Sequence, residues 1–133
     1  MSAPTWIHAD VVLAIHRRQL SEHGGADGVR DAGLLASALA RPQNILAYSE
    51  APADFAALAA AYAFGIARNH PFLDRNKRTA YVVYRTFLIL NGHDLAASRE
   101  EKYSTFLSLA EGKLSEDALV AWIREHLTTP PTA

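Results

Sequence analysis

The segment HPFLDRNKRTA, which begins at His70, gathers side chains that could carry out chemistry. His70 supplies an imidazole, a side chain that can take a proton from an attacking hydroxyl. Asp74 supplies a carboxylate, and Lys77 and Arg78 supply two adjacent positive charges. Because these groups lie within nine residues of one another, we expect them to share one site, with His70 as its general base.

A helix expected to begin at Asn76 or Lys77 would offer its first-turn amides to an anion. These N–H groups have no partner inside the helix, and the helix dipole places partial positive charge at the same end. The two cations add full charge, Asn76 adds an amide donor, and Thr79 adds a hydroxyl. So many donors suit the oxygens of a di- or triphosphate, so the segment is predicted to bind phosphate.

Asp74 lies directly before this turn, as a carboxylate among bases. Beside bound phosphates, such a group commonly holds Mg²⁺ through one protein oxygen, with water and phosphate oxygens as the other ligands. A purely structural interpretation is also open, in which His70, Asp74 and Asn76 are helix caps and the two cations are solvated surface. Phe72 is expected to be a core anchor that fixes the loop under either interpretation.

The elements that must position this segment are predicted to be helices. Apolar residues recur at helical spacing, and capping residues precede several of these runs. No stretch alternates as a strand would, and no internal repeat is visible. The expected starts are Ala9, Asp31 as a cap, Asp54 as a cap, Asn76 or Lys77, Ser98, and Ser115. The sequence therefore predicts an all-α single domain over residues 1–133, with its core at about 8–127 and a frayed tail at 128–133.

Pro42 is expected to end the second helix, because proline disfavours helical backbone at the residue before it. Residues Arg41 to Pro52 would then form a loop with room for one short hairpin. The run from Asp54 to Ile66 is rich in alanine, so neighbouring helices could approach its backbone closely. This third helix is predicted to be central and buried.

The composition excludes several classes of function. The net charge of −1 gives no electrostatic case for binding nucleic acid or an anionic membrane. An all-α DNA-binding module stays a minor alternative, because the basic pairs Arg17-Arg18 and Lys77-Arg78 are not joined by a basic stripe. Cysteine is absent, which excludes a disulfide framework and a thiolate zinc site. With no signal peptide and no apolar run of membrane-spanning length, a soluble cytoplasmic protein is expected.

The string H-P-F-x-D-x-N-K-R-T-A, followed by Asn91-Gly92 at the end of the helix, resembles the motif of death-on-curing proteins in the Fic/Doc family. The resemblance continues in three segments of the N-terminal half, His23–Asp31, Leu35–Gln43 and Ala61–Ala67. It implies a compact bundle of about six helices in which the motif loop binds a nucleotide. It also implies a flap that positions the target segment, here between Arg41 and Pro52.

The resemblance implies a role for each motif residue: His70 as base, Phe72 as core anchor, Asp74 as magnesium ligand, and Asn76, Lys77 and Arg78 as phosphate binders. Members that transfer AMP carry G-N-G-R-x-x-R here, whereas this chain has Lys77 at the second glycine and Tyr81 at the last arginine. Glycine lets phosphate approach the backbone, and lysine fills that space. In the Doc branch this difference accompanies transfer of the γ-phosphate of ATP to a threonine of elongation factor Tu, which arrests translation.

The implied partner is an antitoxin whose C-terminal segment folds into a groove on the toxin. Two other functions stay open: an AMP transferase acting on a protein hydroxyl, and a catalytically impaired module that only binds the antitoxin. The second follows from Arg75, which occupies a position that is small in most relatives. A non-glycine residue resists positive φ, and its long cation would either crowd the phosphates or add another contact to them.

Overall fold

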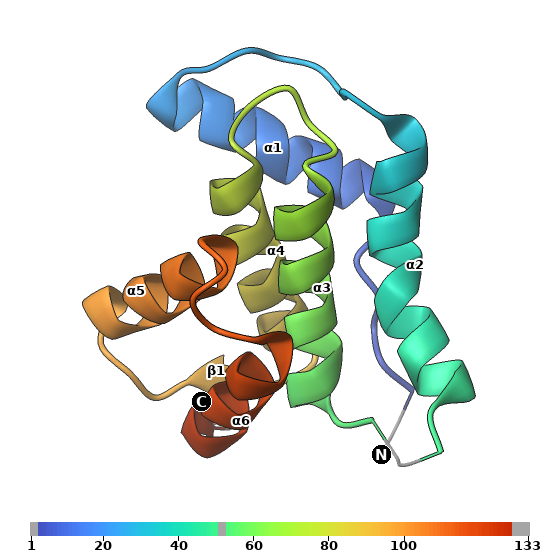
Figure 1. Ribbon diagram of the computed structural model, residues 1–133, viewed down its shortest axis with the longest axis vertical. Helices are drawn as coiled ribbons and strands as arrows, with labels where there is room; N and C mark the ends of the chain where they lie inside the picture. The colour runs from blue at the N-terminus through green and yellow to red at the C-terminus, as the bar shows by residue number, and fades with distance from the viewer. Residues whose placement is uncertain (1–2, 51–52, 129–133) are drawn as a thin grey trace.

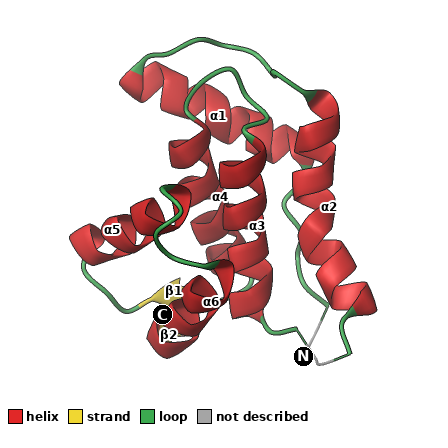
Figure 2. Cartoon of the chain, in the orientation of Figure 1, coloured by secondary structure: helices red, strands yellow, loops and turns green. Residues whose placement is uncertain are grey.

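The computed structural model describes residues 3–50 and 53–128, and six helices make up most of that part of the chain (Figures 1 and 2). The helices are α1 (Ala9–His23), α2 (Ala32–Tyr48), α3 (Phe55–Asn69), α4 (Asn76–Leu90), α5 (Arg99–Ala110) and α6 (Glu116–His126). Two short strands, β1 (Asp94–Leu95) and β2 (Leu127–Thr128), pair antiparallel. The prediction of an all-α bundle is confirmed. No helix in the described ranges is long and apolar enough to cross a membrane.

Helix α3 runs through the middle of the bundle, as its alanine content predicts (Figure 1). It packs against α2, α4, α5 and α6. Its small side chains allow close approach: a Cβ added at Gly65 would lie 3.3 Å from the Cα of Ala38 in α2. The buried alanines of α3 surround larger core residues such as Tyr62 and Ile66. The C-terminal end of α3, which His70 follows, therefore has a fixed position in the bundle.

Four of the helices begin at side-chain caps. The cap carboxylates and hydroxyls accept from backbone N–H groups three residues on, at 2.9 to 3.1 Å, which stabilises a helix start by about 1 kcal/mol. The capping residues are Asp31, Asp54, Ser98 and Ser115. These predicted starts are confirmed. Helix α4 begins without such a cap.

Pro42 does not end α2, which continues to Tyr48, so the prediction of a loop from Arg41 to Pro52 is wrong. Pro42 lies on the buried face of the helix, and packing against α3 offsets the hydrogen bond that proline cannot make. Arg41 adds to this by pairing with Glu116 of α6. Residues 41–48 are therefore helix and contain no flap hairpin, while Ala51 and Pro52 lie outside the described residues.

The chain end differs from the prediction at one described residue. Thr128 was expected to belong to a frayed tail, but it pairs with Asp94 in the short sheet. This pairing and the carbonyl of His126, which accepts from the backbone N–H of Ala96, connect the end of α6 to the segment before α5. Residues 129–133 lie outside the described part of the chain.

Tyr84 provides a stability test. Its hydroxyl is buried with no hydrogen-bond partner among the described residues, and burial raises its pKa. Since an unpaired buried hydroxyl costs about 1–3 kcal/mol, Tyr84→Phe is expected to raise the free energy of unfolding in urea titrations. Tyr62→Phe is the matched control, because the Tyr62 hydroxyl accepts from the N–H of Ile7 at 3.1 Å. Tyr62→Phe should lower the free energy of unfolding. If both variants changed this free energy in the same direction, this account would be contradicted.

Candidate active site

The motif loop joins the end of α3 to the start of α4 at one end of the bundle (Figure 1). A cavity of about 340 Å³ opens there. Its lining residues are His70, Leu73, Asp74, Arg75, Asn76, Lys77, Arg78 and Tyr103. Of the residues predicted for the site, Phe72 and Thr79 are buried and do not line this cavity. The other predicted site residues do line it, together with Leu73 of the same loop and Tyr103 of α5.

His70 is the residue at which α3 ends. Its backbone is left-handed, with φ of 47° and ψ of 57°, and its N–H donates to the carbonyl of Ile66. The side chain is exposed, and among the described residues its ring makes no hydrogen bond. The imidazole is therefore available to a hydroxyl that enters the cavity.

Phe72 and Asn76 lock the loop. Phe72 is 1% exposed, and its ring stacks on His16 of α1 with the centroids 3.9 Å apart, which confirms it as a core anchor. The Asn76 amide accepts from the Phe72 N–H at 2.9 Å and donates to the Phe72 carbonyl at 3.0 Å. Asn76 was predicted to donate to phosphate, but its buried side chain is used to close the loop. Its backbone amide still belongs to the first turn of α4.

Asp74 lies in the cavity wall as an ionised carboxylate. Hydrogen bonds from the backbone N–H groups of Arg75 at 2.8 Å and Ala26 at 3.3 Å hold its pKa below the usual range. Each oxygen accepts one of these bonds and keeps further acceptor capacity, which fits a single protein ligand for Mg²⁺. Gly25 packs directly against this carboxylate, because a Cβ added there would lie 2.8 Å from Asp74 Oδ2. A larger residue at position 25 would therefore displace Asp74.

Arg75 adopts a left-handed backbone, with φ of 60° and ψ of 29°. Its guanidinium points to α1, where Nε donates to the carbonyl of Gly24 at 2.7 Å and Nη2 donates to that of His23 at 2.5 Å. Arg75 therefore caps the C-terminal end of α1, where a positive charge is favourable. The sequence left open whether this cation would crowd the phosphates or contact them; in the structure, both hydrogen bonds of its guanidinium are made to the end of α1.

Arg75→Ala should lower the free energy of unfolding by about 1–2 kcal/mol, because it removes both bonds and keeps a residue that resists positive φ. Arg75→Gly should lose less, since glycine tolerates that backbone. ATP affinity, measured by calorimetry, should change by less than about threefold in both variants. Lys77→Ala is the contrasting control and should weaken ATP binding with little effect on unfolding. A tenfold loss of affinity in Arg75→Ala would contradict this assignment.

The first turn of α4 presents donors to the cavity. No side chain caps this end, and the helical hydrogen bonds begin with the N–H of Thr79, which donates to the Arg75 carbonyl at 3.0 Å. Lys77 is exposed, and the guanidinium of Arg78 lies 5.4 Å from the centre of the Tyr103 ring. An anion in the cavity would meet open amides and two cations together.

Tyr103 is the residue from outside the motif loop and α4 that lines the cavity without having been predicted from the sequence. No motif singles it out in the sequence, because its place beside Arg78 depends on how α5 packs on α4. Arg78 and Tyr103 also line a second cavity of about 580 Å³ between these helices. The cavity at the motif loop therefore adjoins a larger one.

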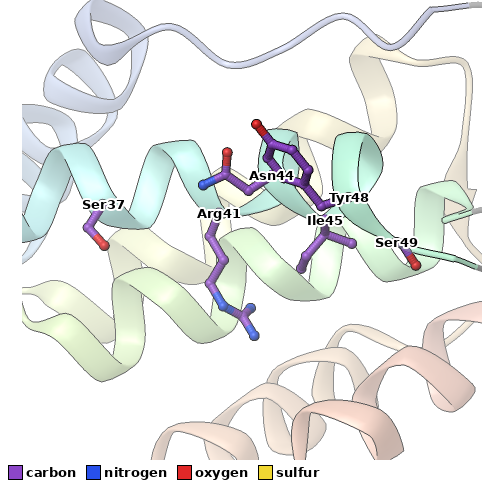
Figure 3. A pocket seen from close by; sticks show the side chains of 6 residues that line it. All are labelled: Ser37, Arg41, Asn44, Ile45, Tyr48 and Ser49. Atoms are coloured by element: carbon purple, nitrogen blue, oxygen red, sulfur yellow. The ribbon is translucent and has the colours of Figure 1, made fainter.

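A separate hollow of about 510 Å³ follows the exposed side of α2 (Figure 3). Its lining residues are Ser37, Arg41, Asn44, Ile45, Tyr48 and Ser49. The only cation among them, Arg41, points away from Tyr48 and Asn44, pairs with Glu116, and lies 5.0 Å from the centre of the Phe64 ring. The lining of this hollow contains no imidazole, carboxylate or helix start of the kind found in the first cavity.

Comparison with known proteins agrees with the geometry. The sequence profile described as the Fic/DOC family matches residues 6–88, which include the loop and most of α4. The chain belongs to the Fic/DOC family.

Two relatives of this Fic/DOC protein carry functional names. A protein named Toxin Doc, from Mycolicibacterium smegmatis, is 47% identical over 74 residues, which cover 56% of this chain and 57% of the relative. A protein named Protein kinase doc, from Escherichia phage P1, is 32% identical over 118 residues, which cover 89% of this chain and 92% of the relative. This Fic/DOC chain therefore aligns along most of the phage protein and along little more than half of the mycobacterial one.

Proposed function

We propose that this Fic/DOC protein is a toxin kinase that transfers the γ-phosphate of ATP to a hydroxyl of a protein target. The observation that carries the proposal is the shared cavity. It places the His70 imidazole, the ionised Asp74 carboxylate and the uncapped start of α4 around one space. Lys77 and Arg78 add the charge that a triphosphate needs.

In the proposed reaction, the target hydroxyl oxygen forms a bond to the γ-phosphorus while the bond to the β,γ-bridging oxygen breaks, and ADP leaves. His70 takes the hydroxyl proton. The α4 amides, Lys77 and Arg78 stabilise negative charge on the phosphate oxygens. Asp74 would hold Mg²⁺, which neutralises charge on the phosphates when bound.

Two observations favour γ-phosphate transfer over AMP transfer. Lys77 stands where AMP-transferring relatives have a glycine, so its side chain takes the space in which a phosphate would approach the backbone. The relative aligned along 89% of the chain is named a protein kinase. The AMP transferase is the second candidate, since both reactions use a base and a phosphate site.

The proposed target is a threonine of elongation factor Tu, so the activity would arrest translation in the cytoplasm. The name of the mycobacterial relative, Toxin Doc, supports a toxin. We further propose control by an antitoxin whose C-terminal segment folds on binding, consistent with coupled folding and binding.

The deciding experiment incubates the protein with Mg²⁺, elongation factor Tu, and ATP labelled at either the γ- or the α-phosphate. Label from the γ-position on a threonine is expected. Label from the α-position would replace the kinase with the AMP transferase. No transfer from either position, with no ATP binding by calorimetry and intact antitoxin binding, would identify a catalytically impaired binding module.

A further inference from the structure

The connection between α1 and α2 is hydrogen-bonded to the motif loop. Val29 forms an antiparallel bridge with Phe72, and the N–H of Leu73 donates to the carbonyl of Gly28 at 3.0 Å. Figure 1 shows the two segments at the same end of the bundle. The loop that carries the candidate base is therefore held from a segment about 40 residues earlier in the sequence.

Arg30, in this connection, donates three hydrogen bonds to the end of α3 and the motif loop. Its Nη2 donates to the carbonyl of Asn69 at 2.7 Å, its Nε donates to the carbonyl of His70 at 2.7 Å, and its backbone N–H donates to the carbonyl of Pro71 at 2.7 Å. One residue thus binds three consecutive carbonyls around the candidate base. The next residue, Asp31, caps α2, so Arg30 is fixed to a rigid helix start.

The position of His70 makes this arrangement necessary. The last carbonyls of a helix have no partner inside it, and a cation near them is favourable. His70 also has a left-handed backbone, which costs a non-glycine residue about 1–3 kcal/mol and persists only where surrounding contacts enforce it. Because the imidazole has no hydrogen bond of its own among the described residues, its direction depends on this backbone.

We infer that Arg30 is a positioning residue for the general base: its guanidinium fixes the backbone of His70 so that the imidazole faces the cavity. The catalytic effect of Arg30 rests on the proposed function, whereas its hydrogen bonds to the motif loop belong to the fold. Arg30 touches neither nucleotide nor target in this account. Its loss should therefore lower kcat and leave ATP binding intact.

The test compares Arg30→Ala and Arg30→Lys with the wild-type protein in the γ-phosphate assay. Arg30→Ala should lower kcat by about tenfold or more, because small misplacement of a catalytic group is costly, while KM for ATP changes by less than about threefold. Arg30→Lys should restore little of the lost kcat, since one ammonium cannot reproduce the paired hydrogen bonds of the guanidinium to two carbonyls. Added guanidinium ion at concentrations below those that unfold the protein should restore part of the activity of Arg30→Ala. Arg18→Ala is the control, since Arg18 lies on the exposed side of α1 and its single ion pair within residues 3–50 and 53–128 is with Glu22.

A second measurement does not depend on activity. Backbone ¹⁵N relaxation should show increased motion at the amides of His70 and Phe72 in Arg30→Ala, with α5 and α6 unchanged. Unchanged kcat with unchanged relaxation would overturn the inference, as would a rise in KM for ATP that accounts for the whole loss. If the wild-type protein transfers no phosphate at all, the proposed function fails, and relaxation still decides whether Arg30 holds His70.

Discussion

His70→Ala is expected to abolish phosphoryl transfer while the protein stays folded. A positioned general base contributes about 10²- to 10⁴-fold to the rate, so kcat should fall by a factor of about 10² or more. Folding should be unaffected, because the His70 side chain is exposed and makes no hydrogen bond within the described residues. ATP affinity should also be retained, since the proposed phosphate donors belong to α4. The measurements are initial rates with γ-labelled ATP, calorimetric titration with ATP, and thermal unfolding.

His8→Ala is a matched control for this prediction. His8 is exposed, directly precedes α1, and makes no capping bond with its side chain. It should keep wild-type rates. If His70→Ala retained a tenth of the wild-type kcat, another group would have to take the hydroxyl proton, and the proposed mechanism would be wrong.

Phe72→Ala is expected to produce the largest loss of stability, about 3–5 kcal/mol in urea unfolding. The ring is 1% exposed and stacks on His16, whose Nε2 lies 3.0 Å from the carbonyl oxygen of Asp74. Removing the ring leaves a cavity beneath the motif loop. Since small domains are stable by only about 5–15 kcal/mol, this loss would remove a large fraction of the total stability.

Leu73→Ala tests whether burial is the cause. Leu73 is the next residue in the same loop, but it is 56% exposed. Its truncation should change the free energy of unfolding by less than about 0.5 kcal/mol. Equal losses in the two variants would show that the loop sequence, rather than the buried ring, determines stability.

The features that sequence could predict are those set by neighbouring residues. Asp31 and Asp54 were identified as caps because a cap acts on an amide three residues away. The start of α4 at Asn76 agrees with the predicted start at Asn76 or Lys77, although no side chain caps it. The cluster around His70 was predictable because its members are close in sequence and the loop is short.

The features that sequence could not predict depend on tertiary contacts. Pro42 lies inside α2 because that face is buried against α3, and no local rule contains this information. Arg75 binds carbonyls more than 50 residues earlier in the chain, and Tyr103 reaches the cavity from α5. The sequence identified Asn76 as a donor but not that Phe72 would receive its bond.

The hydrogen bonds between the α1–α2 connection and the motif loop also define which segments would be needed to transfer this site to another protein. The motif from His70 to Arg78 would not keep its geometry if grafted alone onto another helical scaffold, because Arg30 and Gly28 hold it from outside. Gly25 belongs to the same graft, since a larger residue there would collide with Asp74. The smallest portable unit is therefore two chain segments with the helix ends that anchor them.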